Sequence, residues 1–99
     1  MSASKLGAMF AALEDTDEYL KFERIESPLH PRADIAAFLL LHNLVPATGD
    51  MVASASHDEI WLDTDVAKLG RVATEVDVLT LVRCGVRYDD ELESLGMYT

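Results

Sequence analysis

The sequence predicts an α+β fold in a single compact domain over residues 1–99, with about four helices packed on one face of a short antiparallel sheet of about three strands. Three observations indicate this class. Apolar residues at helical spacing fill the first half of the chain, and paired capping signals mark further helices between residues 64 and 85. The alternating segment at 58–63 and the hairpin predicted over 86–98 favour strands. With 49% hydrophobic residues, a chain of 99 residues can bury one modest core.

The N-terminal segment carries one apolar helical stripe. Its members recur at i, i+3, i+4 and i+7, and they are Leu6, Met9, Phe10 and Leu13. Ser2 or Ser4 is available as the N-cap. Two outcomes stay open beyond the stripe: the helix continues to about Arg24, or it breaks near Asp15.

Residues 27–31 form a connector, because each proline restricts the residue before it to extended geometry. Pro31 suits the first position of a helix over residues 32–44, and Pro46 ends that helix. The helix is apolar around most of its circumference, so we expect it to be the central and most buried element.

A turn is predicted at 47–50, and 51–57 is either extended or irregular. Residues 58–63 alternate, with Ile60 and Leu62 on one face and Glu59, Trp61 and Asp63 on the other. This pattern predicts a strand with an acidic outer face. Trp61 is either exposed there or covered by another segment.

Thr64 or Asp65 can cap a short helix that Gly70 ends, and Thr74 with Asp77 resembles a capping box. The following helix would be terminated by Gly85, although its β-branched residues also allow a strand. Residues 86–98 then read as a hairpin whose turn is acidic.

The charge distribution is the most distinctive functional feature. The net charge is −10, and 12 of the 18 acidic residues lie in three clusters without Lys or Arg. The clusters are Glu14, Asp15, Asp17 and Glu18; Asp58, Glu59, Asp63 and Asp65; and Asp89, Asp90, Glu91 and Glu93. Such patches attract basic partners, although solubility or adaptation to high salt also produces acidic surfaces.

Composition and motifs argue against several classes. The eight basic residues are dispersed and the glycines isolated, which excludes a dense basic face for nucleic acid and a phosphate loop. The longest apolar run is too short to span a membrane, and no secretory signal is recognisable. One cysteine cannot form an internal disulfide, so we expect a cytoplasmic protein.

Enzymatic and metal sites have little support in the sequence. His30, His42, His57 and Cys84 lack metal-ligand spacing, and no serine has the surroundings of a nucleophile. Cys84 near a helix C-terminus is expected to pack rather than react. Acidic segments lack the spacing of a calcium-binding loop. We therefore expect no catalytic residues, no metal and no cofactor.

The sequence favours a non-enzymatic interaction protein that binds a basic surface of a partner protein. The expected binding residues are Asp58, Glu59, Trp61, Asp63, Asp65, Asp89, Asp90, Glu91 and Glu93. If their segments share one sheet, eight carboxylates form a continuous face. In its sharpest form this is an inhibitor that mimics nucleic acid and blocks a nucleic-acid-binding protein. In size and charge alone, the chain resembles small phage-encoded inhibitors of host defence, such as some anti-CRISPR and anti-restriction proteins.

Two alternatives belong to other classes. The Leu-rich helix over 32–44 has more apolar surface than a small domain easily covers, which would suit a homodimer or another oligomeric module. A small metal-dependent enzyme built on carboxylates would use His42, His57 or Asp63 as a ligand or acid/base group.

Overall fold

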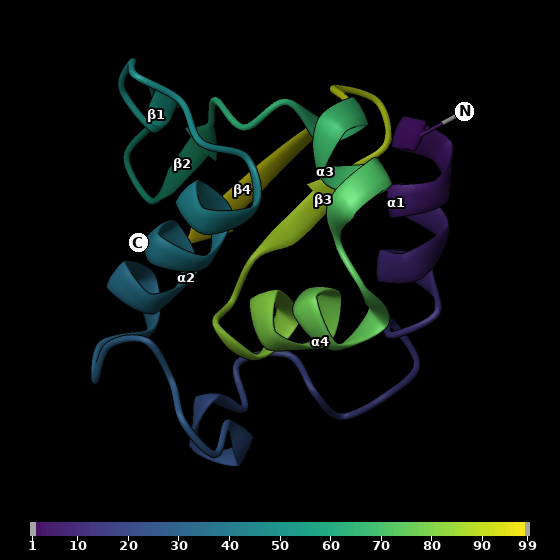
Figure 1. Ribbon diagram of the computed structural model, residues 1–99, viewed down its shortest axis with the longest axis vertical. Helices are drawn as coiled ribbons and strands as arrows, with labels where there is room; N and C mark the ends of the chain where they lie inside the picture. Colours follow the sequence, from purple (N-terminus) through teal and green to yellow (C-terminus); the bar gives the residue numbers. More distant parts are fainter. Residues whose placement is uncertain (1, 99) are drawn as a thin grey trace.

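A computed structural model describes residues 2–98, with side chains from residue 5 onward, and its fold is α+β (Figure 1). The helices are α1 (Ser2–Ala11), α2 (Ala33–Leu44), α3 (Val66–Val72) and α4 (Glu75–Arg83), with a short 3₁₀ helix η1 (Phe22–Arg24). The strands are β1 (Val52–Ala55), β2 (Glu59–Leu62), β3 (Arg87–Asp89) and β4 (Ser94–Tyr98). The radius of gyration is 12.3 Å, close to the roughly 13 Å of a compact fold of this length.

The strands form one antiparallel sheet in the order β1-β2-β4-β3. The sheet has four strands rather than the expected three, because segment 51–57, left open by the sequence, supplies β1. β1 pairs with β2, so its backbone is satisfied by a neighbour that the weak pattern of its own residues did not reveal. The predicted hairpin is confirmed as β3 and β4.

The two faces of the sheet have different roles. Leu62, Leu95 and Met97 lie on the core face and join the buried cluster that also contains helix residues such as Leu6 and Leu81. Paired residues of antiparallel strands share a face. The register Glu59↔Tyr98, Trp61↔Gly96 and Arg87↔Gly96 therefore groups those side chains on the opposite, outer face. The alternation predicted for β2 is confirmed.

The first helix ends at Ala11, which is before Asp15, and it does not continue to Arg24. Tight turns follow, with the Leu13 and Glu14 amides donating to Phe10 and Ala11 carbonyls at 3.0 and 3.1 Å. Leu20 then adopts φ +63° and donates its amide to the Val82 carbonyl at the end of α4. This tertiary contact competes with helix continuation. Capping by Ser2 or Ser4 lies outside the described side chains.

Helix α2 departs from prediction at its start and in its burial. Arg32 is the N-cap with extended backbone, and its amide donates to His30 Nδ1 at 3.0 Å, so Pro31 lies before the helix rather than at its first position. Only Ala36, Ala37 and Leu41 are buried, while Leu39 remains 40% exposed. The expectation that this is the most buried element is wrong, because α2 packs along one side only.

The predicted caps at the C-terminal helices are largely confirmed. The Asp65 carboxylate accepts the amides of Ala67 and Lys68 at 3.0 and 3.1 Å, which begins α3. Gly70 does not end α3, because the helix continues to Val72 while packing against α1. That packing outweighs the roughly 1 kcal/mol penalty of one helical glycine.

Helix α4 has marked ends. The Asp77 amide donates to Thr74 Oγ1 at 3.2 Å and the Thr74 amide to Asp77 Oδ2 at 2.9 Å, which completes the capping box. At the other end Gly85 has φ +97°. The amides of Gly85 and Val86 donate to the carbonyls of Val82 and Leu81, the arrangement of a Schellman motif. The segment is therefore a helix and not the alternative strand.

Candidate functional site

Six of the predicted binding residues lie at one end of the sheet, where β2 ends and β3 turns into β4 (Figure 1). The register places Leu62 beside Leu95 and Asp89 beside Ser94, and Ser94 Oγ lies 3.5 Å from the Leu62 carbonyl oxygen. We call this group the acidic edge. It consists of Asp63, Asp65, Asp89, Asp90, Glu91 and Glu93.

Two carboxylates of the acidic edge stabilise local structure. Asp65 caps α3, and Asp89 Oδ1 accepts the Leu92 amide at 2.9 Å within the turn. Glu93 adopts φ +49°, which returns the chain into β4. The other side chains, of Asp63, Asp90, Glu91 and Glu93, are exposed, and no ion pair within residues 5–98 involves them. These four carboxylates thus present unpaired negative charge at this end, where Lys68 lines a hollow with Asp63 and Asp65.

The structure does not bring all eight carboxylates of the second and third clusters together. Asp58 and Glu59 lie at the start of β2, opposite Tyr98, whereas Asp63 follows its end. At about 3.3 Å per residue, the strand separates these positions by roughly 10 Å or more. The middle cluster is therefore divided between the two ends of the sheet, and the expected continuous face does not form.

Trp61 is half-buried on the outer face, where it serves an intramolecular contact. The Arg87 guanidinium lies 5.7 Å from the Trp61 ring centroid and 4.1 Å from that of Tyr98. Arg87 Nη2 also forms an ion pair with the Glu59 carboxylate. We call these four residues the Arg87 stack. An arginine does contact Trp61 and Glu59, but it belongs to the same chain.

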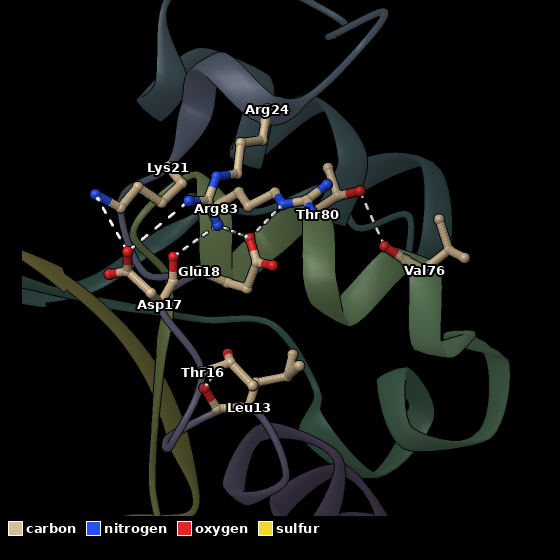
Figure 2. Close-up of polar contacts among 9 residues, drawn as sticks. All are labelled: Leu13, Thr16, Asp17, Glu18, Lys21, Arg24, Val76, Thr80 and Arg83. Carbon is tan, nitrogen blue, oxygen red and sulfur yellow. Dashed lines mark hydrogen bonds and ion pairs between the residues drawn. The ribbon is translucent and has the colours of Figure 1, made fainter.

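The first acidic cluster is likewise partly neutralised inside the molecule (Figure 2). Glu18 Oε1 accepts hydrogen bonds from Arg24 Nη1 at 2.9 Å and from Arg83 Nε at 3.1 Å. These donors, Arg83 first, lower the pKa of the Glu18 carboxyl below its usual value. Asp17 lies 3.8 Å from the charged nitrogens of Lys21 and Arg24. Glu14 and Asp15 are exposed.

A pocket of about 370 Å³ lies where α1 and the segment after it meet β3 and the end of α4. We call it the aromatic pocket. Its lining residues are Phe10, Leu13, Glu14, Tyr19, Val82, Val86, Arg87 and Tyr88. The rings of Phe10 and Tyr88 stack with centroids 6.0 Å apart. The pocket falls within the size range of small-ligand sites, which begins near 300 Å³.

Of the metal and acid/base candidates, His42 and Asp63 line one hollow of about 110 Å³ together with Asp50, Asp65 and Lys68. Among the described residues, no group of three or more His, Cys, Asp or Glu side chains is placed to hold a metal ion. Cys84 is 2% exposed at the end of α4, and burial raises its thiol pKa to about 11. That environment suppresses the thiolate, as expected for a packing cysteine.

No helix in the described part of the chain has the length and apolarity to cross a membrane.

Sequence reasoning did not identify Arg87, Tyr98 or the aromatic pocket. Arg87 and Tyr98 meet Trp61 only because β4 lies between β2 and β3, a strand order that no local pattern encodes. The one available signal was the hairpin itself, whose alternation puts Arg87 and Tyr98 on one face. The pocket joins residues 10–19 to residues 82–88, which are remote in sequence.

Comparisons of the chain with protein-family models, curated proteins and solved structures found no match.

Proposed function

We propose that this protein is a non-enzymatic, cytoplasmic interaction protein that uses the acidic edge to bind a basic surface of a partner protein. One observation carries the proposal. At least five of the eight basic side chains, those of Lys21, Arg24, Arg32, Arg83 and Arg87, are engaged in ion pairs within the molecule. Four carboxylates of the acidic edge are exposed without such a partner among the described residues.

The backbone of the acidic edge supports this role. The Asp89 carboxylate secures the turn through the Leu92 amide, and the turn connects two paired strands. Exposed charges held on such a frame need little ordering when they bind. In a protein of net charge −10, they would speed association and select basic partners more than they would set affinity.

The sharper form of the proposal is an inhibitor that mimics nucleic acid. A groove that binds phosphates presents several Lys and Arg side chains, and closely spaced carboxylates can occupy it in their place. This form requires that binding of the protein and binding of nucleic acid to the partner exclude one another. Competition with labelled duplex DNA or RNA on the captured partner tests it directly, and simultaneous binding would reject it.

The binding proposal is tested by charge reversal at the turn. We expect Asp90→Lys combined with Glu91→Lys to weaken partner capture strongly, and capture by the unmodified protein to fall between about 50 and 500 mM salt. The matched control is Glu23→Lys with Glu26→Lys, which makes the same charge change in the blue segment at the bottom of Figure 1, away from the yellow turn. Equal losses in both variants, or capture that salt does not change, would reject the acidic edge as the binding site.

A second candidate is a homodimer formed through α2. Leu39 on α2 is 40% exposed, and Leu29, which is 52% exposed, lines a hollow of about 250 Å³ together with Ala36 and Leu40 of α2. Self-association must overcome the repulsion between two chains of charge −10, which ranks this candidate second. Light scattering decides it, because a monomer mass that does not change with concentration would exclude the dimer.

A further inference from the structure

The aromatic pocket combines flat apolar walls with an accessible carboxylate. Phe10 and Tyr88 form a stacked pair, and Tyr19, which is 36% exposed, also lines the pocket. Glu14 is exposed and takes part in no ion pair within residues 5–98. The faces of aromatic rings attract cations, and a carboxylate pairs with them.

Arg87 lines the same pocket and its side chain is 28% exposed, but its charge is paired within the molecule. Its Nη2 pairs with Glu59, both Nη2 and Nε are inaccessible to solvent, and its guanidinium lies over the Tyr98 ring. An anionic ligand could form a two-pronged contact with Arg87 only by dismantling the Arg87 stack. Of the two charged residues that line the pocket, Glu14 is therefore the one without an ion pair among the described residues.

The two tyrosines of the pocket have different electrostatic surroundings. Burial raises the pKa of the Tyr19 hydroxyl and the charge of Arg87 opposes that increase, whereas Tyr88 lies near negative charges. Burial raises the pKa of the Tyr88 hydroxyl, and the charges of Glu93, Asp90 and Asp89 raise it further. A Cβ added at Gly7 would lie 3.0 Å from Tyr88 Cε1 and 3.2 Å from Asp90 Oδ1, so the Tyr88 wall of the aromatic pocket adjoins the acidic edge. A cation that approaches the acidic edge thus finds an aromatic recess beside it.

The Arg87 stack provides an internal precedent for the ligand. There, two aromatic rings and one carboxylate hold a guanidinium. Tyr88, Tyr19 and Glu14 offer the same chemical groups at the pocket, where Phe10 is 7% exposed and stacks on Tyr88. A planar guanidinium stacks on aromatic faces better than the compact ammonium of lysine does.

We propose that the aromatic pocket receives one arginine side chain of the basic partner protein, with the guanidinium against the aromatic walls and paired with Glu14. This inference rests on the proposed function, since it assigns a contact within the same protein interface. The acidic edge would supply long-range attraction, and the pocket would supply short-range selection of arginine.

The probe for the test is N-acetyl-arginine amide, titrated into the labelled full chain and followed by NMR. We expect saturable shifts centred on Phe10, Tyr19 and Tyr88. N-acetyl-citrulline amide has nearly the same shape without the charge, and we expect it to bind at least several-fold more weakly. Equal binding of both probes, shifts located elsewhere, or no saturable shifts would overturn the proposal.

Two variants assign the contacts. Glu14→Gln should weaken binding of the arginine probe about two- to fivefold and leave citrulline binding unchanged, as expected for an exposed ion pair. Tyr19→Leu keeps apolar volume but removes the ring. It should weaken binding of the arginine probe about two- to fivefold. Glu26→Gln, the same charge change at an exposed position outside the pocket, should have no effect. An equal effect of Glu26→Gln would overturn the assignment. Circular dichroism verifies that each variant is folded.

The pocket and the acidic edge can fail separately. If the arginine probe does not bind, yet partner capture still depends on Asp90 and Glu91, only the pocket proposal fails. If the probe binds as expected but capture is indifferent to the charge reversals, the proposed function fails and the arginine site remains.

Discussion

The guanidinium of Arg87 contacts the rings of Trp61 and Tyr98 on the outer face of the sheet and is paired with a carboxylate from another strand. These contacts depend on which residues lie opposite one another on neighbouring strands. Trp61 can cover the sheet because Gly96, its partner on β4, has no side chain. Trp61, which the sequence suggested as a hot spot for a partner, therefore contacts an arginine of its own chain. We call this contact the clamp.

Gly96→Ala tests the clamp. An added Cβ would lie 2.8 Å from Trp61 Cζ3, so the ring must move and the Arg87 stack must rearrange. We expect the free energy of unfolding to fall by about 1–3 kcal/mol, as for overpacking. Urea denaturation measures the loss, and the fluorescence of Trp61, the only tryptophan, should change.

Gly49→Ala is the matched control, because a Cβ added there would meet no atom within 4 Å. Its effect should remain within about 0.5 kcal/mol. Similar stability losses in the two variants would contradict the role given to Trp61.

At the scale of elements, the helix ends are where sequence reasoning worked best. The Thr74 capping box, the Asp65 cap and the Gly85 terminator involve residues a few positions apart, so local chemistry determines them. Predictions failed where an element meets the rest of the fold. α3 continues past Gly70, and Leu39 on α2 stays exposed, because packing decides both outcomes.

Thr74→Ala tests how much one local signal contributes. The substitution removes the acceptor of the Asp77 amide, and we expect α4 and the whole protein to lose about 1 kcal/mol of unfolding free energy. Thermal and urea unfolding measure it. Thr48→Ala, in the exposed turn before β1, is the control and should change stability by less than about 0.5 kcal/mol. No difference between the variants would contradict the role assigned to the cap.

At the scale of the whole molecule, ion pairs join segments that are distant in sequence. Glu18 accepts from Arg83, 65 positions away, and from Arg24, so it holds the segment between α1 and η1 against α4. The same pairing neutralises Arg24 and Arg83 within the molecule, while Asp63, Asp90, Glu91 and Glu93 have no ion pair among the described residues. The ion pairs that hold these segments together thus also determine which charges stay unpaired at the surface.

The pH dependence of stability tests the Glu18 contact. Arg83 and Arg24 lower the pKa of Glu18 in the folded protein. Its contribution is therefore complete above the unfolded pKa of about 4.3 and is lost as pH falls through the lower folded value. We expect the stability difference between the unmodified protein and Glu18→Gln to be largest near about pH 7 and to shrink below about pH 4.5.

Comparing this pair of proteins at each pH cancels the effect of the other carboxylates, whose protonation relieves self-repulsion. Glu26→Gln, at an exposed position outside the described ion pairs, provides the control and should give a smaller and flatter difference. A Glu18→Gln difference that does not vary with pH would contradict the assignment.

The sequence by itself determined the fold class, the start of α3, both ends of α4, the alternation of β2 and the excess of acidic charge. These depend on residues within a few positions of one another or on composition alone. Only the tertiary structure decided that β4 lies between β2 and β3. That order divides the middle acidic cluster, gives Trp61 and Glu59 to Arg87, and sets residues 10–19 beside residues 82–88. The physical reason is that strand order and burial depend on contacts between remote segments, which local periodicity does not encode.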